Sequence, residues 1–247
     1  MAETTSVPSL PPAYETCGSQ DNTAHGSDPD PALDPGQGPS SFLDPMSLID
    51  PGTLYVADRF IHCQDPDAPP LYELSHAVDF LRDSDRTVRL ERLEYSLKRH
   101  RPRDGTNNPP SISTKRRCLY ELKHPTPGEY PTFPFHAESA SRQSLCTFGL
   151  ATFRPKRLSS AKGFRVFRAA RTAGTTVARR ALLFSAVPSK DASVLFDWLG
   201  RDGTALAAET DSAGLKSLVI GTRMSLVMHE ALVAAWITRI WWRMAHG

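Results

Sequence analysis

Hydrophobic and polar residues alternate in short runs from residue 53 onward. The run TVRLERLEYSL (residues 87–97) places Val88 and Leu90, and after an offset Leu93, Tyr95 and Leu97, on one side with charges between them. A period of two is typical of half-buried β-strands. Similar runs recur along the chain between Pro-rich and Gly-rich breaks. They predict roughly ten short strands, which suits a barrel or a large bent sheet.

Two of the breaks predict turns between neighbouring strands. Asp202 and Gly203 separate two apolar runs, and Asp-Gly favours the positive φ angles of a tight hairpin. The polar residues 96–117 predict a long turn with Asp104 and Gly105 at its tip.

The pattern changes at the carboxyl-terminal end, where SLVMHEALVAAWITRIWWRMAHG contains no proline and no internal glycine. We predict a helix over about residues 225–244, apolar almost all round. Such a helix lies in a protein core, in a membrane interface or across a bilayer. His229, Glu230 and Arg239 favour the core, since a charge at mid-membrane costs about 2.5–3.5 kcal/mol. The residues expected to face the core are Leu226, Val233, Trp236, Ile237, Ile240 and Trp241.

These elements predict a mainly β domain over residues 51–247. We expect a closed or nearly closed antiparallel β-barrel of about 10–12 strands around the hydrophobic helix.

The first 50 residues differ in composition from the rest. They contain eight acidic residues, eight prolines and no Lys or Arg, so their formal charge is −8. Because the whole chain carries +2, residues 51–247 carry +10. The segment has too little apolar surface to offset the entropy of ordering it, and we predict that residues 1–50 are a disordered tail.

This tail contains a Pro-Pro-x-Tyr sequence formed by Pro11, Pro12 and Tyr14. Two prolines favour a polyproline II helix, which the aromatic groove of a WW domain binds. The same tetrapeptide also arises by chance in Pro-rich tails, so both interpretations stay open. WW domains are frequent in HECT-type ubiquitin ligases, which suggests a recruitment or degradation signal.

Basic residues form the other candidate site, because several lie close together in predicted loops. They are positioned to attract anionic lipid such as a phosphoinositide, or they simply solvate loops and strand faces. Aromatic residues do not interleave with them, which disfavours nucleic acid. Ser159, in the run KRLSS, fits a basophilic kinase acceptor. The candidate anion-binding residues are Lys98, Arg99, Arg101, Arg103, Lys115, Arg116, Arg117, Lys156 and Arg157.

Catalytic and metal-binding motifs are missing from the sequence. There is no dinucleotide-binding, P-loop or nucleophile-elbow signature. His229 and Glu230 begin like a zincin helix, but Val233 stands where the second histidine belongs. The four cysteines form no Cys-x-x-Cys pair. We therefore expect no enzyme activity, no metal and no cofactor. The start of the chain lacks a secretory signal, so we expect an intracellular, cytoplasmic protein, with peripheral membrane binding left open.

Several of these runs together resemble a group of filamentous-fungal proteins of the tubby C-terminal-like superfamily, which also includes LURP-one-related proteins and phospholipid scramblases. The runs are PPAYE, LYVADRFIH, PLYELSHAV, RLERLEY, LYELKH, FDWLGRDGTALAAE and HEALVAAWITRIWWR. The resemblance covers residues 53–244 and implies a closed barrel around a central helix. It also implies phosphoinositide binding or membrane association, and no catalytic site. The acidic tail and the RPRDGTNNPPSIST insertion depart from the group.

Two functions follow as expectations. The first is a non-catalytic interaction protein, an adaptor or substrate of a HECT-type ubiquitin ligase recruited through the tail. The second is a peripheral membrane protein that binds anionic lipid through its basic loops.

Overall fold

The computed structural model describes residues 47–64, 68–98, 111–124, 132–155, 161–171, 177–212 and 214–246, with backbone only at 98, 171 and 177–180. Twelve strands form a closed barrel, and every neighbouring pair is antiparallel. The barrel strands are β2 (Gly52–Ala57), β3 (Phe60–Cys63), β4 (Tyr72–Leu74), β5 (Thr87–Lys98), β6 (Ser111–Lys123), β7 (Phe135–Ser139), β8 (Phe148–Phe153), β9 (Gly163–Arg171), β10 (Val177–Pro188), β11 (Phe196–Gly200), β12 (Ala205–Ser212) and β13 (Leu215–Ile220). The prediction of a mainly β, closed antiparallel barrel is confirmed.

The barrel is a meander in which each strand pairs with the next along the chain, and one seam closes it. At the seam β13 pairs with β2, so that Val219 lies opposite Thr53. A separate two-stranded sheet joins β1 (Leu48–Ile49) to β14 (Met224–Ser225). A short 3-10 helix, η1 (Val78–Phe80), precedes β5.

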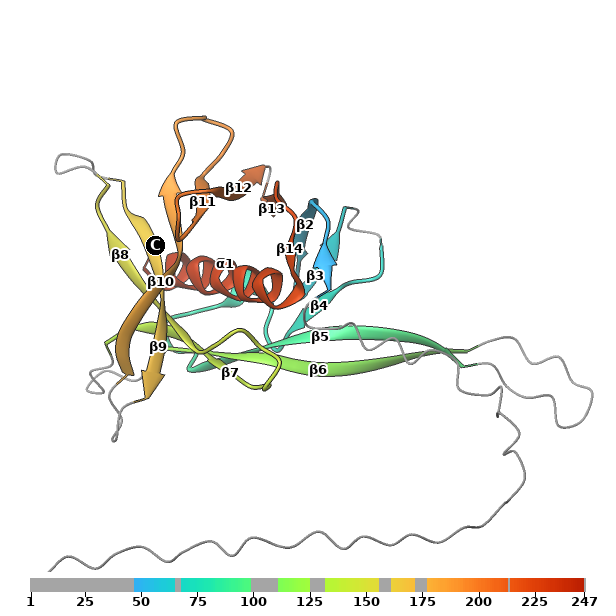
Figure 1. Ribbon diagram of the computed structural model, residues 1–247. Coiled ribbons are helices and arrows are strands. Elements are labelled where there is room, and N and C mark those ends of the chain that lie inside the picture. The colour runs from blue at the N-terminus through green and yellow to red at the C-terminus, as the bar shows by residue number, and fades with distance from the viewer. Residues whose placement is uncertain are drawn as a thin grey trace, which may run out of the picture. The chain divides into compact units, whose positions relative to one another are not determined.

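The helix α1 (Leu226–His246) runs through the space that the barrel strands surround (Figure 1). Its side chains reach strands on different sides of the ring. Trp241 packs edge-on against Phe135 of β7, with ring centroids 5.3 Å apart, and Arg239 lies over the Phe196 ring of β11. The helix is therefore the core that the barrel closes around.

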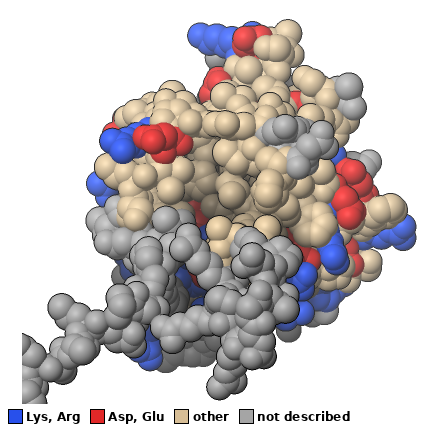
Figure 2. Space-filling model, turned by 90° about the vertical axis from the view of Figure 1, so that its right-hand side faces the viewer, with Lys and Arg blue, Asp and Glu red and all other residues tan. Residues whose placement is uncertain are grey.

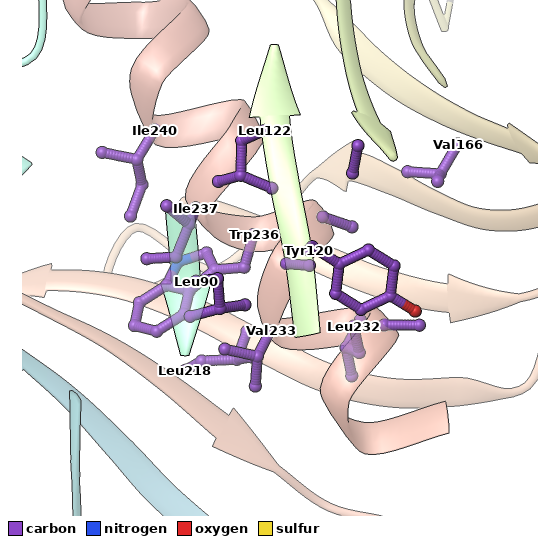
Figure 3. Close-up of a cluster of buried hydrophobic side chains, with 14 of the residues drawn as sticks. Leu90, Tyr120, Leu122, Val166, Leu218, Leu232, Val233, Trp236, Ile237 and Ile240 are labelled. Carbon is purple, nitrogen blue, oxygen red and sulfur yellow. The ribbon is translucent and has the colours of Figure 1, made fainter. Parts of the chain in front are cut away.

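The predicted core residues of the helix are all buried: Leu226, Val233, Trp236, Ile237, Ile240 and Trp241. In Figure 3 helix residues such as Trp236 and Ile237 lie among strand residues such as Leu90 and Leu218. The helix carries small residues as well, and Ala234 and Ala235 are fully buried. Small side chains let the strand residues approach the helix closely, so that large and small residues interdigitate.

The two predicted turns have different outcomes. Gly203 has φ +86° in the connection between β11 and β12, which confirms the hairpin and explains the need for glycine. The long turn predicted over residues 96–117 is wrong in its bounds, because β5 continues to Lys98 and β6 begins at Ser111. Cross-strand pairing continues through residues that polarity alone assigns to a loop. Asp104 and Gly105 lie outside the described residues.

Candidate functional site

The strands β5 and β6 are the longest consecutive pair of the meander and extend past their other neighbours. β4 pairs with β5 only as far as Arg92, and β7 pairs with β6 only from Tyr120 onward. We call residues 93–98 of β5 and 111–118 of β6 the ribbon. Figure 1 shows it projecting away from the barrel. Within the described chain, each strand of the ribbon therefore pairs only with the other strand of the ribbon, and its outer edge has no strand beside it.

The two faces of the ribbon differ in chemistry. Arg92 points toward the helix, so the alternation of side chains along β5 puts Leu93, Tyr95 and Leu97 on the opposite face. Leu97 pairs directly with Ile112 across the ribbon. Leu97 is 71% exposed and Ile112 is 69% exposed.

Tyr95, another side chain of this face, is held in place by a hydrogen bond. Tyr95, which is partly exposed, donates a hydrogen bond from Oη to the carbonyl oxygen of Pro70 at 2.9 Å. In the side view of Figure 2, Lys, Arg, Asp and Glu lie mainly toward the rim of the face. By their exposed fractions, Tyr95, Leu97 and Ile112 form a small apolar patch on the ribbon.

The basic residues predicted at the end of a loop lie instead within β6. Lys115, Arg116 and Arg117 stand opposite Glu94, Leu93 and Arg92 of β5, several residues from the end of the ribbon. Arg116 Nε lies 3.0 Å from Glu73 Oε2, and Arg117 Nη2 donates to Ser141 Oγ at 3.0 Å. Among these three, Lys115 and Arg116 are well exposed, and Arg117 is half-buried.

The remaining predicted site residues lie outside the described side chains. The WW-ligand residues Pro11, Pro12 and Tyr14 and the kinase acceptor Ser159 are among them, as are five of the basic residues. Lys98 is described only as the last backbone position of β5. The five basic residues are Arg99, Arg101, Arg103, Lys156 and Arg157.

A charged cluster lies where the ribbon leaves the barrel. Arg92 Nη1 donates to Glu230 Oε1 of the helix at 2.6 Å, and Arg92 Nη2 donates to Glu94 Oε1 at 2.6 Å. Burial raises the pKa of Glu230, and the charge of Arg92 opposes that rise. Burial also tends to lower the pKa of Arg92, but its bonds to Glu94 and Glu230 outweigh burial and the pKa is raised. The arginine is therefore charged and holds the start of the helix to β5.

A cleft borders this cluster, lined by Arg117, Leu119, Gln143 and Leu226 among others. It encloses about 200 Å³ of space between atoms, part of which is open to solvent. The lining side chains leave no enclosed space for even a water-sized molecule. The cleft is thus too small for a typical organic cofactor.

A second buried polar pair joins the helix to β4. Tyr72 Oη and His229 Nδ1 share a hydrogen bond of 3.0 Å, and both side chains are buried. Burial lowers the pKa of His229 to about 4, so the imidazole is neutral at physiological pH. Burial also raises the pKa of Tyr72. Two neutral groups therefore satisfy each other's hydrogen bond.

A third polar contact lies deeper along the helix. Arg239 forms an ion pair with Glu209 of β12, and Glu209 also accepts a hydrogen bond from Trp198 Nε1 at 3.3 Å. Burial raises the pKa of Glu209, while Arg239 and Trp198 oppose the rise. Every charged or titratable residue on the buried part of the helix thus has a partner on a strand.

Sequence reasoning missed these strand partners. Arg92 and Glu209 stand in ordinary strand runs, and alternation assigns each simply to one face of its strand. The three titratable residues expected in the core of the helix, His229, Glu230 and Arg239, gave a signal, because a buried charge needs a partner of opposite sign. Which strand supplies that partner depends on the barrel closure.

Among the described residues no group of His, Cys, Asp and Glu could hold a metal ion. No helix in the part of the chain that the structure covers is long and apolar enough to cross a membrane. Comparisons with protein-family models, with curated proteins and with solved structures found no match.

Proposed function

We propose that this chain is a non-catalytic interaction protein whose barrel works through its outer surface. The observation that carries the proposal is the helix inside the barrel: its residues from Ala231 to Ile237 are buried without a break. Small-molecule enzymes of barrel form need interior or rim space for a substrate. Here the interior space holds the chain's own side chains, which supports a scaffold role.

We also propose that the domain is of the tubby C-terminal-like type. A closed barrel of twelve antiparallel strands around a carboxyl-terminal helix supports this proposal, because it matches the architecture that the sequence resemblance implies. Fold likeness suggests little about chemistry, so the function must come from surfaces and motifs.

The first interaction is with a WW domain, through Pro11, Pro12 and Tyr14. A polyproline II segment loses little conformational entropy on binding, and the tyrosine ring fills a pocket beside the proline groove. A HECT-type ubiquitin ligase is the proposed owner of that domain. The chain then acts as an adaptor that recruits the ligase, or as its substrate.

A pulldown with isolated WW domains tests this interaction. We expect Tyr14→Ala to lower recovery of the full chain by about tenfold or more, since the ring anchors the ligand. Pro8→Ala is the matched control, because it removes a proline outside the motif. Equal recovery of the wild type, Tyr14→Ala and Pro8→Ala would remove the tail from this function.

The second candidate function is binding to an anionic membrane surface, favoured by the exposed Lys115 and Arg116 on a ribbon that projects from the barrel. Each cation near an anionic surface contributes about 1 kcal/mol. The sequence places Arg99, Arg101 and Arg103 directly after this part of β5. A projecting ribbon can approach a flat surface without interference from the barrel.

Flotation with vesicles of phosphatidylcholine, with and without phosphatidylserine, tests the second function. We expect the wild type to float only with the anionic vesicles, and less at high salt. The variant Lys115→Glu/Arg116→Gln should float less. Lys190→Glu is the control, because Lys190 is exposed but follows β10 and lies outside the ribbon, and this variant should float like the wild type. Salt-independent flotation, or equal flotation of all variants, would exclude a charge-based surface.

A further inference from the structure

We propose that Leu97 and Ile112 insert into the boundary between headgroups and acyl chains of an anionic membrane. The inference rests on the second candidate function and adds to it a hydrophobic anchor. The pair is directly cross-strand and lies at the end of the ribbon described side chain by side chain. About seven-tenths of each side chain is in water, so each has apolar surface left to bury.

The size of the patch favours a bilayer over a protein partner. A stable protein interface uses about 20–30 residues on each side. In the part of the ribbon that the structure describes, the patch consists of three side chains, Tyr95, Leu97 and Ile112. A bilayer gives useful affinity to far fewer groups, because each buried CH₂ contributes about 0.8 kcal/mol.

The surroundings of the patch match the layers of a membrane surface. Tyr95 lies on the same face but farther from the ribbon end, with its hydroxyl hydrogen-bonded to Pro70. Tyrosine is enriched at headgroup depth, where its ring is half in an apolar medium. Arg116, which pairs with Leu93 and so lies on the same face as Ile112, is nearer the barrel, where it would meet anionic headgroups. Lys115 stands beside it on the other face of the ribbon. Of the described side chains the aliphatic pair is therefore placed deepest, with aromatic and cationic groups above it.

The ribbon can be substituted without unfolding the barrel, because the two aliphatic side chains are mostly in solvent. Substituting exposed residues usually changes stability by less than about 0.5 kcal/mol. Phe80 is a matched control: it is also 71% exposed, but it belongs to η1 and not to the ribbon.

The test uses the full chain and vesicles of phosphatidylcholine and phosphatidylserine. We expect Leu97→Ser/Ile112→Ser to lose about tenfold or more in vesicle partitioning, while Phe80→Ser partitions like the wild type. The binding that remains in the double variant should disappear at high salt. In Leu97→Trp, lipids brominated near the headgroup end of the acyl chain should quench more fluorescence than in the wild type, whereas Phe80→Trp should show no extra quenching.

The possible results distinguish insertion of Leu97 and Ile112 from binding to an anionic membrane surface by charge alone. If wild-type binding is salt-sensitive but the double variant binds equally well and Leu97→Trp is not quenched, the anionic surface stands and insertion is overturned. If the wild type does not bind anionic vesicles, both fall. If the double variant instead changes the sedimentation mass of the free chain, the patch joins two copies of the protein and the membrane assignment is wrong.

Discussion

The strands β5 and β6 contain two apolar cross-strand pairs with opposite surroundings. Val88 and Leu122 pair inside the barrel and are fully buried. Leu97 and Ile112 pair in the ribbon and are mostly exposed. The two pairs share strands and residue chemistry, although a bulge between Leu90 and Glu91 shifts the register between them by one residue. What differs is the presence of the helix on the face toward which they point.

The change from one region to the other takes place at Arg92. Up to that residue the inward face of β5 carries Val88 and Leu90, which pack in the core. Beyond it the apolar side chains stand on the other face. A bulge opposite Leu90 and Glu91 also interrupts the register with β6 there. An offset in the alternation thus marks the point at which a strand leaves a barrel.

The largest expected effect concerns Arg92 itself. Arg92→Met leaves Glu230 buried without its partner, and we expect the free energy of unfolding to fall by about 3–5 kcal/mol. Lys115→Met, in the exposed part of β6, should change it by less than about 0.5 kcal/mol. Urea denaturation measures both. The double variant Arg92→Met/Glu230→Met should regain most of the loss, and failure to do so would mean that the ion pair is not the reason.

Truncating one leucine on each side of Arg92 sharpens the comparison. Leu90→Ala opens a cavity beside Trp236 and should cost about 2–5 kcal/mol. Leu97→Ala should cost less than about 0.5 kcal/mol, because its side chain is mostly in water. Thermal and urea unfolding of the two variants check this. Similar losses would show that the ribbon face is covered in solution.

The pair of Tyr72 and His229 predicts how stability depends on pH. The pKa of His229 is about 4 in the folded chain and 6.5 in the unfolded chain, so the unfolded chain binds the proton more readily. Stability from this group is complete above pH 6.5 and declines by up to about 3 kcal/mol as the pH falls toward 4.

His229→Gln isolates this contribution, since glutamine keeps a hydrogen-bonding group near Tyr72 but does not titrate. The difference in unfolding free energy between wild type and variant should shrink from pH 7 to pH 4. Glu209 and Glu230, whose pKa values are raised, contribute equally to both proteins and cancel in the difference. A difference that stays constant with pH would contradict the neutral imidazole.

The smallest expected effect belongs to the ion pair between the exposed Arg116 and the buried Glu73, because Glu73 keeps Arg59 at 3.4 Å as a second cation. The Arg116 side chain is 60% exposed, so Arg116→Ala should cost less than about 1 kcal/mol. Salt should reduce that cost, whereas the cost of Arg92→Met should change little with salt. Unfolding at low and high ionic strength compares the two. Equal salt dependence would contradict their different burial.

The fold could be predicted from local patterns because alternation, Asp202-Gly203 and an all-apolar helix each have a direct physical cause. The ends of β5 and β6 could not, since residues 96–98 and 111–117 are polar except for Leu97 and Ile112, and their pairing depends on the partner strand. The candidate site, too, could be predicted only in part. Basic residues are visible in sequence, but their position along β6 and their ion pairs come from register. The exposure of Leu97 and Ile112 was hidden, because an apolar strand residue looks the same whether or not a helix covers it.

The position of the central helix has a consequence for biosynthesis. Because α1 follows β2 to β13 in the chain, a ribosome releases every barrel strand before the segment that fills their interior. The seam between β13 and β2 joins segments about as far apart in the chain as the fold allows, and such non-local pairing is slow. The apolar faces of the nascent strands would therefore stay exposed to solvent until the helix is synthesised. We expect ribosome-associated chaperones to bind these faces until the last helical turns have left the ribosome.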